Sequence, residues 1–418
     1  MAHLLVCALL LPVPLAAQES STTAAAFRRF AERVVKVEIA EHGAAAKASL
    51  GSGFFVDGEG LLVTNYHVVA EVVREPGRYA PRVVNAAGDT LVAELLGIDV
   101  VHDLAVLRAG WTPPSWFELS NVEPDQGDRV LSLGHPRDLG LSIVEGTWNG
   151  LLRHTLYPKI HFSGSLNPGV SGGPAILPDG RVVGVNVSTE GNEISFLVPV
   201  DRVIALVDRV TAQDYVRPDS LLTEAASQIR AYQDVYLNGL FEPDVPIVTI
   251  GRYQVPTRPA AWFKCWGDAS REPDEPYERV THYCGTDDYL YLSEGQWTGV
   301  VELTHEVLST DELNRFRFYT LYETNFANGA PATWASESEV TEFRCTTRNL
   351  EREGTRLRTA ICARGFRKLP GLYDVVVRAA ALGAPREGLV TSLQLSGVTW
   401  ENATRVTRNF LERISWSE

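Results

Sequence analysis

Short apolar stretches, many with alternating apolar and polar positions, follow one another from Val35 to about residue 199. Glycine, proline and aspartate interrupt them at short intervals. Alternation with a period of two is typical of strands that bury one face, and frequent turn residues indicate short connections between them. We therefore expect an all-β unit in this half of the chain, arranged as a pair of barrels.

Apolar residues at helical spacing lie on both sides of this β-rich stretch. Before it, a helix is predicted over residues 20–33, with apolar positions at Ala24, Phe27, Phe30, Ala31 and Val34. After it, Val203, Leu206 and Val207 share one face of a helix predicted over 200–210. We therefore expect the first domain to comprise residues 20–215.

The second half of the chain is predicted to contain a linker and helix over residues 216–242, then a domain over 243–418. In the helix, the apolar positions are Leu221, Ala225, Ile229, Tyr232 and Val235. Alternation returns beyond it and predicts strands over residues 246–251, 289–292, 297–303, 315–322, 357–363 and 372–379. This second domain is therefore expected to be mostly β. It contains Trp262, Trp266, Trp297, Trp334 and Trp400, which suit either a buried core or a binding face.

Residues 1–17 contain an apolar run, beginning at Leu4, that is too short and too rich in proline for a transmembrane helix. The run ends in small residues before a polar stretch, which predicts a secretory signal cleaved near Ala17. No Lys or Arg precedes it, so the usual positive start of such a signal is missing. We expect an exported protein, periplasmic or secreted, that does not insert into a membrane.

The chain has 418 residues and a formal net charge of -14, which narrows the classes of partner. Nucleic acids and anionic membrane surfaces favour clustered Lys and Arg, so neither is expected as the main partner. No phosphate-binding glycine loop or paired carboxylate site is present, and no cofactor is expected.

The segment from His161 to Pro174 reads HFSGSLNPGVSGGP and is predicted to be a tight loop. It places Ser171 among glycines that can adopt positive φ. The backbone N–H groups of Gly169 and Ser171 can converge on one point, as stabilisation of an oxyanion requires. The simpler alternative is a serine-bearing turn between strands.

A nucleophilic serine needs a histidine base and an acid that orients it, and upstream segments offer both. His67 follows two predicted strands joined by a polar turn, and Asp103 directly precedes an apolar strand. His102 and His161 lack the strand context of His67, and we interpret both as structural.

Taken in the order His, Asp, Ser, these segments resemble the chymotrypsin-fold serine peptidases, and most closely the HtrA (Deg) family. The matching motifs are Gly-Ser-Gly-Phe at 51–54, Thr-Asn-Tyr-His-Val-Val at 64–69, Asp-Leu-Ala-Val-Leu at 103–107, Asn-Pro-Gly-Val-Ser-Gly-Gly-Pro at 167–174, Asp-Gly-Arg-Val-Val-Gly-Val-Asn at 179–186 and Ser-Phe-Leu-Val-Pro at 195–199. The resemblance implies a mainly β fold, with a chymotrypsin-like double β-barrel followed here by a helical linker and the second β domain. The family usually has PDZ domains in that position, and none is recognisable in this sequence.

The resemblance also assigns roles to the candidate residues. It implies that His67 is the general base, Asp103 its orienter and Ser171 the nucleophile, with the N–H groups of Gly169 and Ser171 as oxyanion donors. The family usually has Asn where this chain has Val170, which leaves the resting geometry of the oxyanion site open. The implied activity is that of a serine endopeptidase acting on polypeptides, with unfolded or misfolded proteins as substrates.

Specificity is expected from the walls beside Ser171. In chymotrypsin-like folds the residue six positions before the nucleophile lies at the base of the primary pocket, and here it is Ser165. Without an acidic residue there, a substrate Arg or Lys would have no partner, so a small or medium apolar side chain is expected. Val187, Ser188 and Thr189 are predicted to line the opposite wall.

Four cysteines remain after removal of the predicted signal, all in the second half. In an exported protein they favour disulfides, and of three possible connectivities we prefer Cys265 with Cys284 and Cys345 with Cys362. Each would close a short loop and contribute about 3 kcal/mol in the chain-entropy model. A zinc site is the alternative, but no Cys-x-x-Cys pair occurs and only His282 is close in sequence, so no metal is expected.

Two questions stay open in the sequence. In the resembled family an N-terminal aromatic segment often assembles trimers, so Phe27 and Phe30 either contact other copies of the chain or pack on their own domain. The second question is function, because a peptidase scaffold can also serve as a non-hydrolysing envelope binding or sensor protein. Val170 and the unfamiliar second domain favour that alternative, whereas the complete His-Asp-Ser set favours the enzyme.

Overall fold

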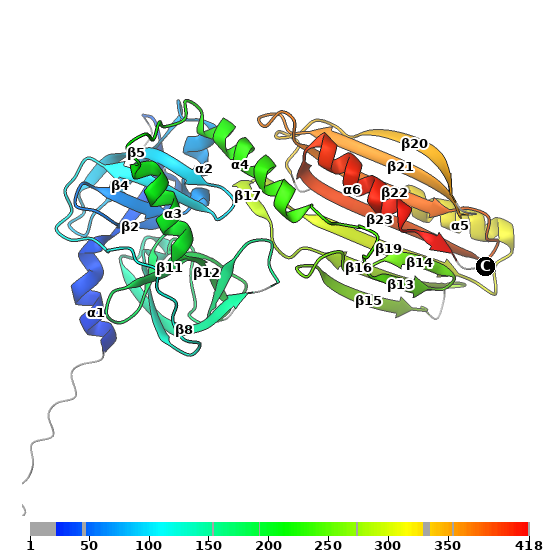
Figure 1. Ribbon diagram of the computed structural model, residues 1–418, viewed down its shortest axis with the longest axis horizontal. Coiled ribbons are helices and arrows are strands. Elements are labelled where there is room, and N and C mark those ends of the chain that lie inside the picture. The colour runs from blue at the N-terminus through cyan, green and yellow to red at the C-terminus, as the bar shows by residue number, and fades with distance from the viewer. Residues whose placement is uncertain are drawn as a thin grey trace, which may run out of the picture.

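The computed structural model describes residues 22–43, 47–152, 154–191, 193–272, 275–328, 335–352 and 355–416. Within these residues the chain forms two closed β-barrels, followed by two helices and a larger antiparallel sheet (Figure 1). This confirms the predicted fold class. The predicted signal segment and Trp334 lie outside the described residues.

The first barrel has the strand order β1-β2-β3-β6-β5-β4, with all neighbours antiparallel. Its strands are β1 (Val34–Glu41), β2 (Lys47–Phe55), β3 (Leu61–Thr64), β4 (Tyr79–Val84), β5 (Thr90–Asp99) and β6 (Leu104–Ala109). Helix α2 (Tyr66–Arg74) follows β3 and buries five apolar side chains and Tyr66 on the outside of this barrel.

The second barrel has the strand order β10-β11-β12-β9-β8-β7. Its strands are β7 (Arg129–Gly134), β8 (Ser142–Leu152), β9 (Lys159–Phe162), β10 (Pro174–Ile176), β11 (Val182–Thr189) and β12 (Ser195–Pro199). A short 3₁₀ turn, η2 (Pro136–Asp138), follows β7. One apolar cluster includes Phe54 and Val106 of the first barrel and Leu133 and Val185 of the second, so the barrels share a core.

The N-terminal helix α1 (Thr22–Phe30) and the 3₁₀ turn η1 (Ala31–Arg33) lead into β1. The Phe30 ring lies 5.6 Å from that of Phe117 and packs so closely on Gly180 that a Cβ there would lie 2.4 Å from it. Phe30 is therefore buried in its own barrel pair and is not available to a second copy of the chain. Phe27 is partly exposed.

Two helices connect the barrels to the large sheet: α3 (Val200–Thr211) and α4 (Leu221–Tyr236). The predicted apolar face of α4 is buried at Leu221, Ala225 and Ile229, whereas Val235 is 67% exposed. Ser220 caps the helix by accepting a hydrogen bond from the Thr223 N–H, which fixes its start.

The C-terminal domain, as we call the described residues beyond 243, is built on a sheet of order β15-β16-β19-β23-β22-β21-β20. These strands are β15 (Lys264–Ser270), β16 (Glu278–Gly285), β19 (Val301–Ser309), β20 (Arg344–Arg352), β21 (Thr355–Gly365), β22 (Tyr373–Ala381) and β23 (Glu387–Val398). The smaller sheets contain β13 (Ile247–Ile250), β14 (Tyr253–Pro256), β24 (Ser415–Trp416), β17 (Leu290–Ser293) and β18 (Gln296–Thr298). Helix α6 (Trp400–Glu412) lies across the sheet (Figure 1) and buries Ala403, Val406 and Phe410.

The strand predicted over residues 315–322 is wrong, because this segment begins helix α5 (Arg315–Asn328). The alternation of Arg315, Phe316, Arg317 and Phe318 imitates a strand, but the buried aromatic residues are Phe318 and Tyr322, which are four positions apart and stack. The Asn314 side chain accepts the N–H groups of Phe316 and Arg317 and so starts the helix. Similarly, the strand predicted over 297–303 is divided at Gly299, where φ is +84°.

Both disulfides have the connectivity that the sequence favoured. Cys265–Cys284 joins β15 to β16 and Cys345–Cys362 joins β20 to β21, each between directly opposite residues. His282 lies 3.4 Å from the Cys284 sulfur, but both sulfurs of that pair are bonded to each other. Neither is therefore a thiolate ligand for a metal.

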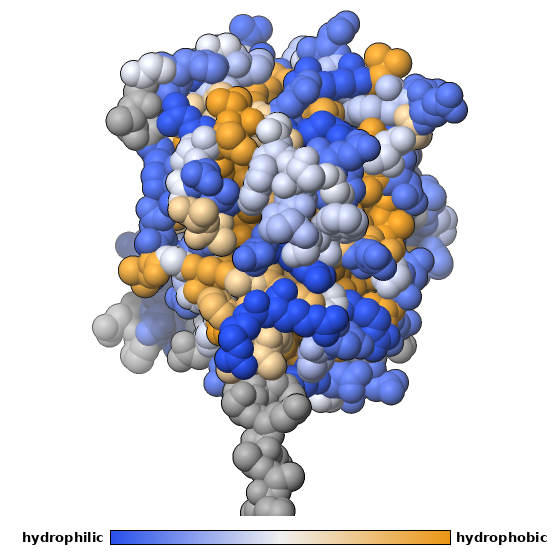
Figure 2. All heavy atoms as spheres, turned by 90° about the vertical axis from the view of Figure 1, so that its left-hand side faces the viewer, coloured by the Kyte–Doolittle hydropathy of each residue, from blue (hydrophilic) through white to orange (hydrophobic). Residues whose placement is uncertain are grey.

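The barrel end of the molecule exposes polar side chains among scattered apolar ones (Figure 2). Of the helices that the structure describes, none is both long and apolar enough to cross a membrane.

Candidate active site

His67 lies in the first turn of α2, directly after the end of β3. Its ring Nδ1 is 2.6 Å from Asp103 Oδ2, and its backbone N–H donates to Oδ1 of the same carboxylate at 2.8 Å. One carboxylate therefore fixes both the ring and the main chain of His67. With Nδ1 donating, Nε2 is the nitrogen that is free to accept a proton.

Asp103 occupies the turn that precedes β6 and is 8% exposed. Its φ of 55° places it in the left-handed region, which Asp and Asn tolerate better than most residues. The buried Asn65 side chain donates to the Asp103 carbonyl at 2.7 Å. Asn65 thus connects the residue that starts α2 to the turn that presents the carboxylate.

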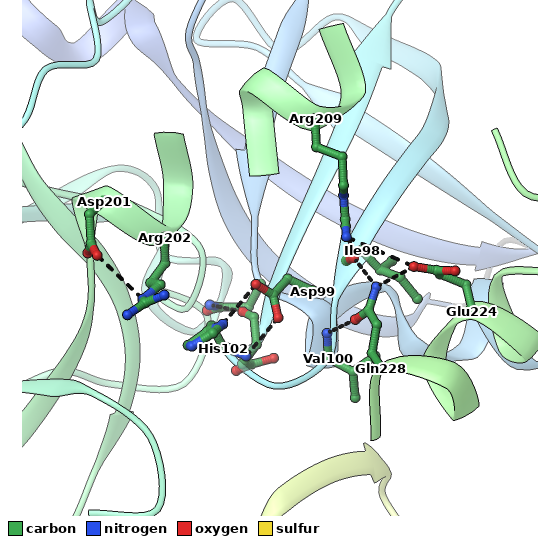
Figure 3. Close-up of polar contacts among 11 residues, drawn as sticks. Ile98, Asp99, Val100, His102, Asp201, Arg202, Arg209, Glu224 and Gln228 are labelled. Carbon is green, nitrogen blue, oxygen red and sulfur yellow. Dashed lines mark hydrogen bonds and ion pairs between the residues drawn. The ribbon is translucent and has the colours of Figure 1, made fainter. Parts of the chain in front are cut away.

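The helices that follow the barrels anchor the chain just before Asp103 (Figure 3). Arg209 of α3 and Gln228 of α4 both donate to the Ile98 carbonyl, at 2.5 and 2.9 Å. The Gln228 oxygen also accepts the Val100 N–H at 2.9 Å. Two helices outside the first barrel thus hold the turn in which Asp103 has its positive φ.

A second His–Asp pair lies beside the first. His102 Nδ1 is 2.8 Å from Asp99 Oδ2 (Figure 3), and the His102 ring packs edge-on against Tyr157 and Tyr232. No serine is hydrogen-bonded to it in the described part of the chain. These contacts agree with the interpretation of His102 as structural.

Ser171 lies in a turn pressed against the first barrel. Its carbonyl accepts the Ser52 N–H at 2.7 Å, and a Cβ at Gly172 would lie 2.2 Å from the Ser52 carbonyl oxygen. Only glycine fits at position 172, where φ is also +85°. A Cβ at Gly51 would touch both Val68 and the Ser171 carbonyl, so the serine lies beside the first turn of α2.

The Ser171 hydroxyl donates to the Val187 carbonyl at 3.3 Å. Among the described residues no hydrogen bond joins this hydroxyl to His67, although Val187 and His67 line the same cleft. Rotation about χ1 moves a serine oxygen between staggered positions, and catalytic hydrogen bonds often tighten only when substrate binds.

The N–H groups of Gly169 and Ser171 have no partner within the ranges that the structure describes. The preceding carbonyls are both held elsewhere: Pro168 accepts the Arg137 N–H at 2.9 Å, and Val170 accepts the Gly173 N–H at 3.0 Å. Because C=O and N–H point in opposite directions across a trans peptide, both N–H groups face away from these anchors. The arrangement offers two donors to a negatively charged oxygen.

Val170, the departure from the resembled motif, is 3% exposed and packs among apolar residues of the second barrel. The peptide groups on both sides of Val170 keep their anchors, because its N–H donates to the Asn167 carbonyl and its own carbonyl accepts the Gly173 N–H. The Ser52 hydroxyl donates to the Gly169 carbonyl at 2.7 Å and so fixes the same loop. Ser52 and Asn65 both lie inside the quoted motifs, but their positioning roles were not predicted.

The electrostatic environment favours a charged His67. Burial alone would lower the pKa of its ring, but the charge of Asp103 and the hydrogen bond to it outweigh burial and raise this pKa above its ordinary value. The ring thus takes up a proton more readily than a free histidine.

A cleft of about 340 Å³ contains His67 and Asp103 in its wall. Val187, Ser188 and Thr189, the predicted specificity wall, are among the residues that line it. Ser165 is exposed and, like Ser171, is not part of this lining, so the role of these residues in specificity stays a prediction. Five consecutive residues of the C-terminal domain, Asp287 to Tyr291, line it as well. The contact of this segment with the cleft could not be predicted from the sequence, because the segment is distant in the chain from every motif.

A double barrel that carries a His–Asp pair on the first barrel and a glycine-bracketed serine on a loop of the second is the arrangement of trypsin-like serine peptidase domains. Residues 51–185 match the family model of the trypsin-like peptidase domain. Within that class, the N-terminal half of the chain is HtrA-like. It is 34% identical over 171 residues to the mitochondrial serine protease HTRA2 of Bos taurus, and 30% identical over 204 residues to a DegP-like periplasmic serine endoprotease of Pseudomonas fulva.

These matches cover 38% and 46% of this chain, and 36% and 41% of the two relatives. The chain thus spans about two fifths of the length of these curated relatives. Among solved structures, the serine endoprotease of Yersinia pestis is 27% identical with a TM-score of 0.41, covering 47% of this chain and 69% of that one. Deg5 is 27% identical with a TM-score of 0.40, covering 46% and 94%.

Proposed function

We propose that the protein is a serine endopeptidase that hydrolyses peptide bonds of unfolded or misfolded proteins. The observation that supports this most directly is that the Asp103 carboxylate binds both the ring Nδ1 and the backbone N–H of His67. The nearby serine loop adds two N–H groups that have no partner among the described residues. In this proposal Ser171 attacks the carbonyl carbon and His67 Nε2 accepts its proton. Asp103 stabilises the imidazolium that results, and the N–H groups of Gly169 and Ser171 bind the oxyanion.

The cellular context belongs to the same proposal. We assign residues 1–17 to a signal, 20–215 to the peptidase domain, 216–242 to the connecting segment and 243–418 to the second domain. Export to the periplasm or beyond is supported by the periplasmic relative and by the two disulfides, although mitochondrial and chloroplast proteins also match. We also propose assembly into a homo-oligomer through the N-terminal segment, where Phe27 is the more accessible aromatic residue.

The test of this function is reaction of the purified full chain with reduced, unfolded casein and with a fluorophosphonate, which modifies activated serines. We expect casein fragments and a single covalent adduct, located at Ser171 by mass spectrometry. Absence of both, across denatured substrates and temperatures, would favour the non-hydrolysing binding protein instead. The observation that favours this alternative is that the Ser171 hydroxyl donates to the Val187 carbonyl and not to His67.

Activity is expected to rise with pH through the titration of His67. The neutral ring is the base, and its raised pKa means that half-maximal kcat/KM falls above pH 6.5. The measurement is a pH profile of kcat/KM on an uncharged peptide substrate. A profile that is flat between about pH 5 and 8 would contradict the role of His67.

A further inference from the structure

We propose that the segment Asp287–Tyr291 of the C-terminal domain is a wall of the substrate cleft, and that Tyr289 there selects an apolar or aromatic substrate side chain. This inference rests on the proposed peptidase function and adds a substrate preference to it. It gives the second domain a part in the active site.

The geometry places this segment directly against the catalytic candidates. The Tyr291 ring lies 5.9 Å from the His67 ring, edge to face at 71°. Across the cleft lie Ser188 and Thr189 at the exposed end of β11. A substrate residue held beside β11 would therefore meet the tyrosines of the C-terminal domain on its other side.

An ion pair locks the wall to the second barrel. Lys159 Nζ of β9 is 2.6 Å from Asp288 Oδ1, and each side chain is 10% exposed. Asp288 Oδ2 accepts the Leu156 N–H at 2.8 Å, so the carboxylate is satisfied on both oxygens. Burial would lower the pKa of Lys159, but Tyr157 and Asp288 outweigh it and raise this pKa, so the lysine stays charged.

Apolar packing locks the wall to the helix of His67 as well. The Tyr66 hydroxyl donates to the Leu292 carbonyl at 3.3 Å, and Leu292, Val340 and Phe366 pack with apolar residues of α2 in one buried cluster. Figure 1 shows β17 beside α2. A large apolar interface restricts relative movement of domains, so the wall has a fixed position.

The segment borders the cleft without filling it. The side chain of His67 remains 28% exposed, and the 340 Å³ cleft persists beside it. Tyr289 is 49% exposed, and its ring lies edge-on against that of Trp297. An exposed tyrosine at the edge of a cleft offers a rigid contact surface at low entropic cost.

The chemistry of the cleft favours an uncharged substrate side chain. The two acidic residues of the wall are already paired, Asp288 with Lys159 and Asp287 with Lys264. Glu190, an exposed acidic residue directly after β11, also lines the cleft, but most of the remaining surface is aromatic or aliphatic, from Tyr157, Tyr289, Tyr291, Leu290, Val100 and Val187. Such a lining suits a leucine- or phenylalanine-sized group.

The test compares wild type with Tyr289→Ala in the full-length protein on a proteome-derived peptide library. For wild type we expect enrichment of apolar or aromatic residues at one position other than the residue just before the cleaved bond. For Tyr289→Ala, kcat/KM for the preferred peptide relative to its alanine-substituted counterpart should fall about tenfold. Tyr319→Ala is the matched control, because Tyr319 is an exposed tyrosine of the same domain outside the cleft.

Fluorophosphonate labelling of Ser171 separates the two proposals. The labelling rate of the control Tyr319→Ala should equal that of wild type, and Tyr289→Ala should still be labelled at Ser171, because a small fluorophosphonate has no side chain to place against the wall. An active wild type whose cleavage profile is unchanged by Tyr289→Ala, or is changed equally by Tyr319→Ala, overturns this inference alone. A wild type that neither labels nor cleaves overturns the peptidase function and this inference with it.

Discussion

Replacement of Ser171 by alanine is expected to lower kcat on unfolded casein by about 10⁴- to 10⁶-fold. The substitution removes the nucleophile, whereas backbone N–H donors and substrate contacts remain. Folding should be unaffected, because the Ser171 hydroxyl makes a single bond of 3.3 Å to a backbone carbonyl.

The measurement is casein cleavage by wild type and by Ser171→Ala, with thermal unfolding of both as the control for folding. Equal rates of cleavage would show that another residue is the nucleophile. Matching unfolding curves together with loss of cleavage would place the defect in the chemistry.

Replacement of Asp103 by asparagine is expected to lower kcat by about 10⁴-fold at neutral pH. Asparagine can present its N–H₂ to Nδ1 of the ring and so favour the tautomer in which Nε2 carries the proton and can no longer accept one from the serine. Asparagine tolerates the left-handed φ of 55° at this position, and its oxygen can still accept the His67 N–H, so the turn should persist.

The chain contains its own control for this variant, because Asp99 forms the neighbouring pair with His102. Asp99→Asn should reduce kcat far less than Asp103→Asn. If the two variants lose activity equally, the effect comes from disturbance of the turn at residues 98–103 and not from the tautomer of His67.

Prediction of the fold from the sequence depended on the type of packing at each element. The barrels were predictable because their strands are short apolar stretches bounded by turn residues, some alternating with polar positions and others, such as β3 and β6, buried almost throughout. The segment 315–322 was not, because an exposed Phe316 next to a buried Phe318 imitates alternation. Helix α6 was missed entirely, although Thr399 caps it and Ala403, Val406 and Phe410 are buried at helical spacing.

For the candidate site, too, residues within local motifs were easier to predict than residues assigned by their distance along the chain. His67, Asp103 and Ser171 lie in short motifs whose local geometry is specified by neighbouring glycines and strand ends. Ser165, by contrast, was expected in the specificity pocket on the basis of its distance along the chain from the nucleophile. Ser165 is exposed and, like Ser171 itself, is not among the residues that line the cleft beside His67, so its place in a specificity pocket stays a prediction; the adjacent Leu166 is buried in the second barrel.

The sequence by itself determined the two barrels, the cysteine pairing and the identity of the three candidate catalytic residues, since each depends on patterns within a few positions or on short loops. Only the tertiary structure decided that Asp103 binds both the ring and the backbone N–H of His67, and that α3 and α4 donate to and accept from the turn before Asp103. It also decided that Asp287–Tyr291 borders the cleft. The physical reason is that these contacts join segments far apart in the chain. The packing of whole domains decides which of these residues meet, and no local sequence pattern predicts it.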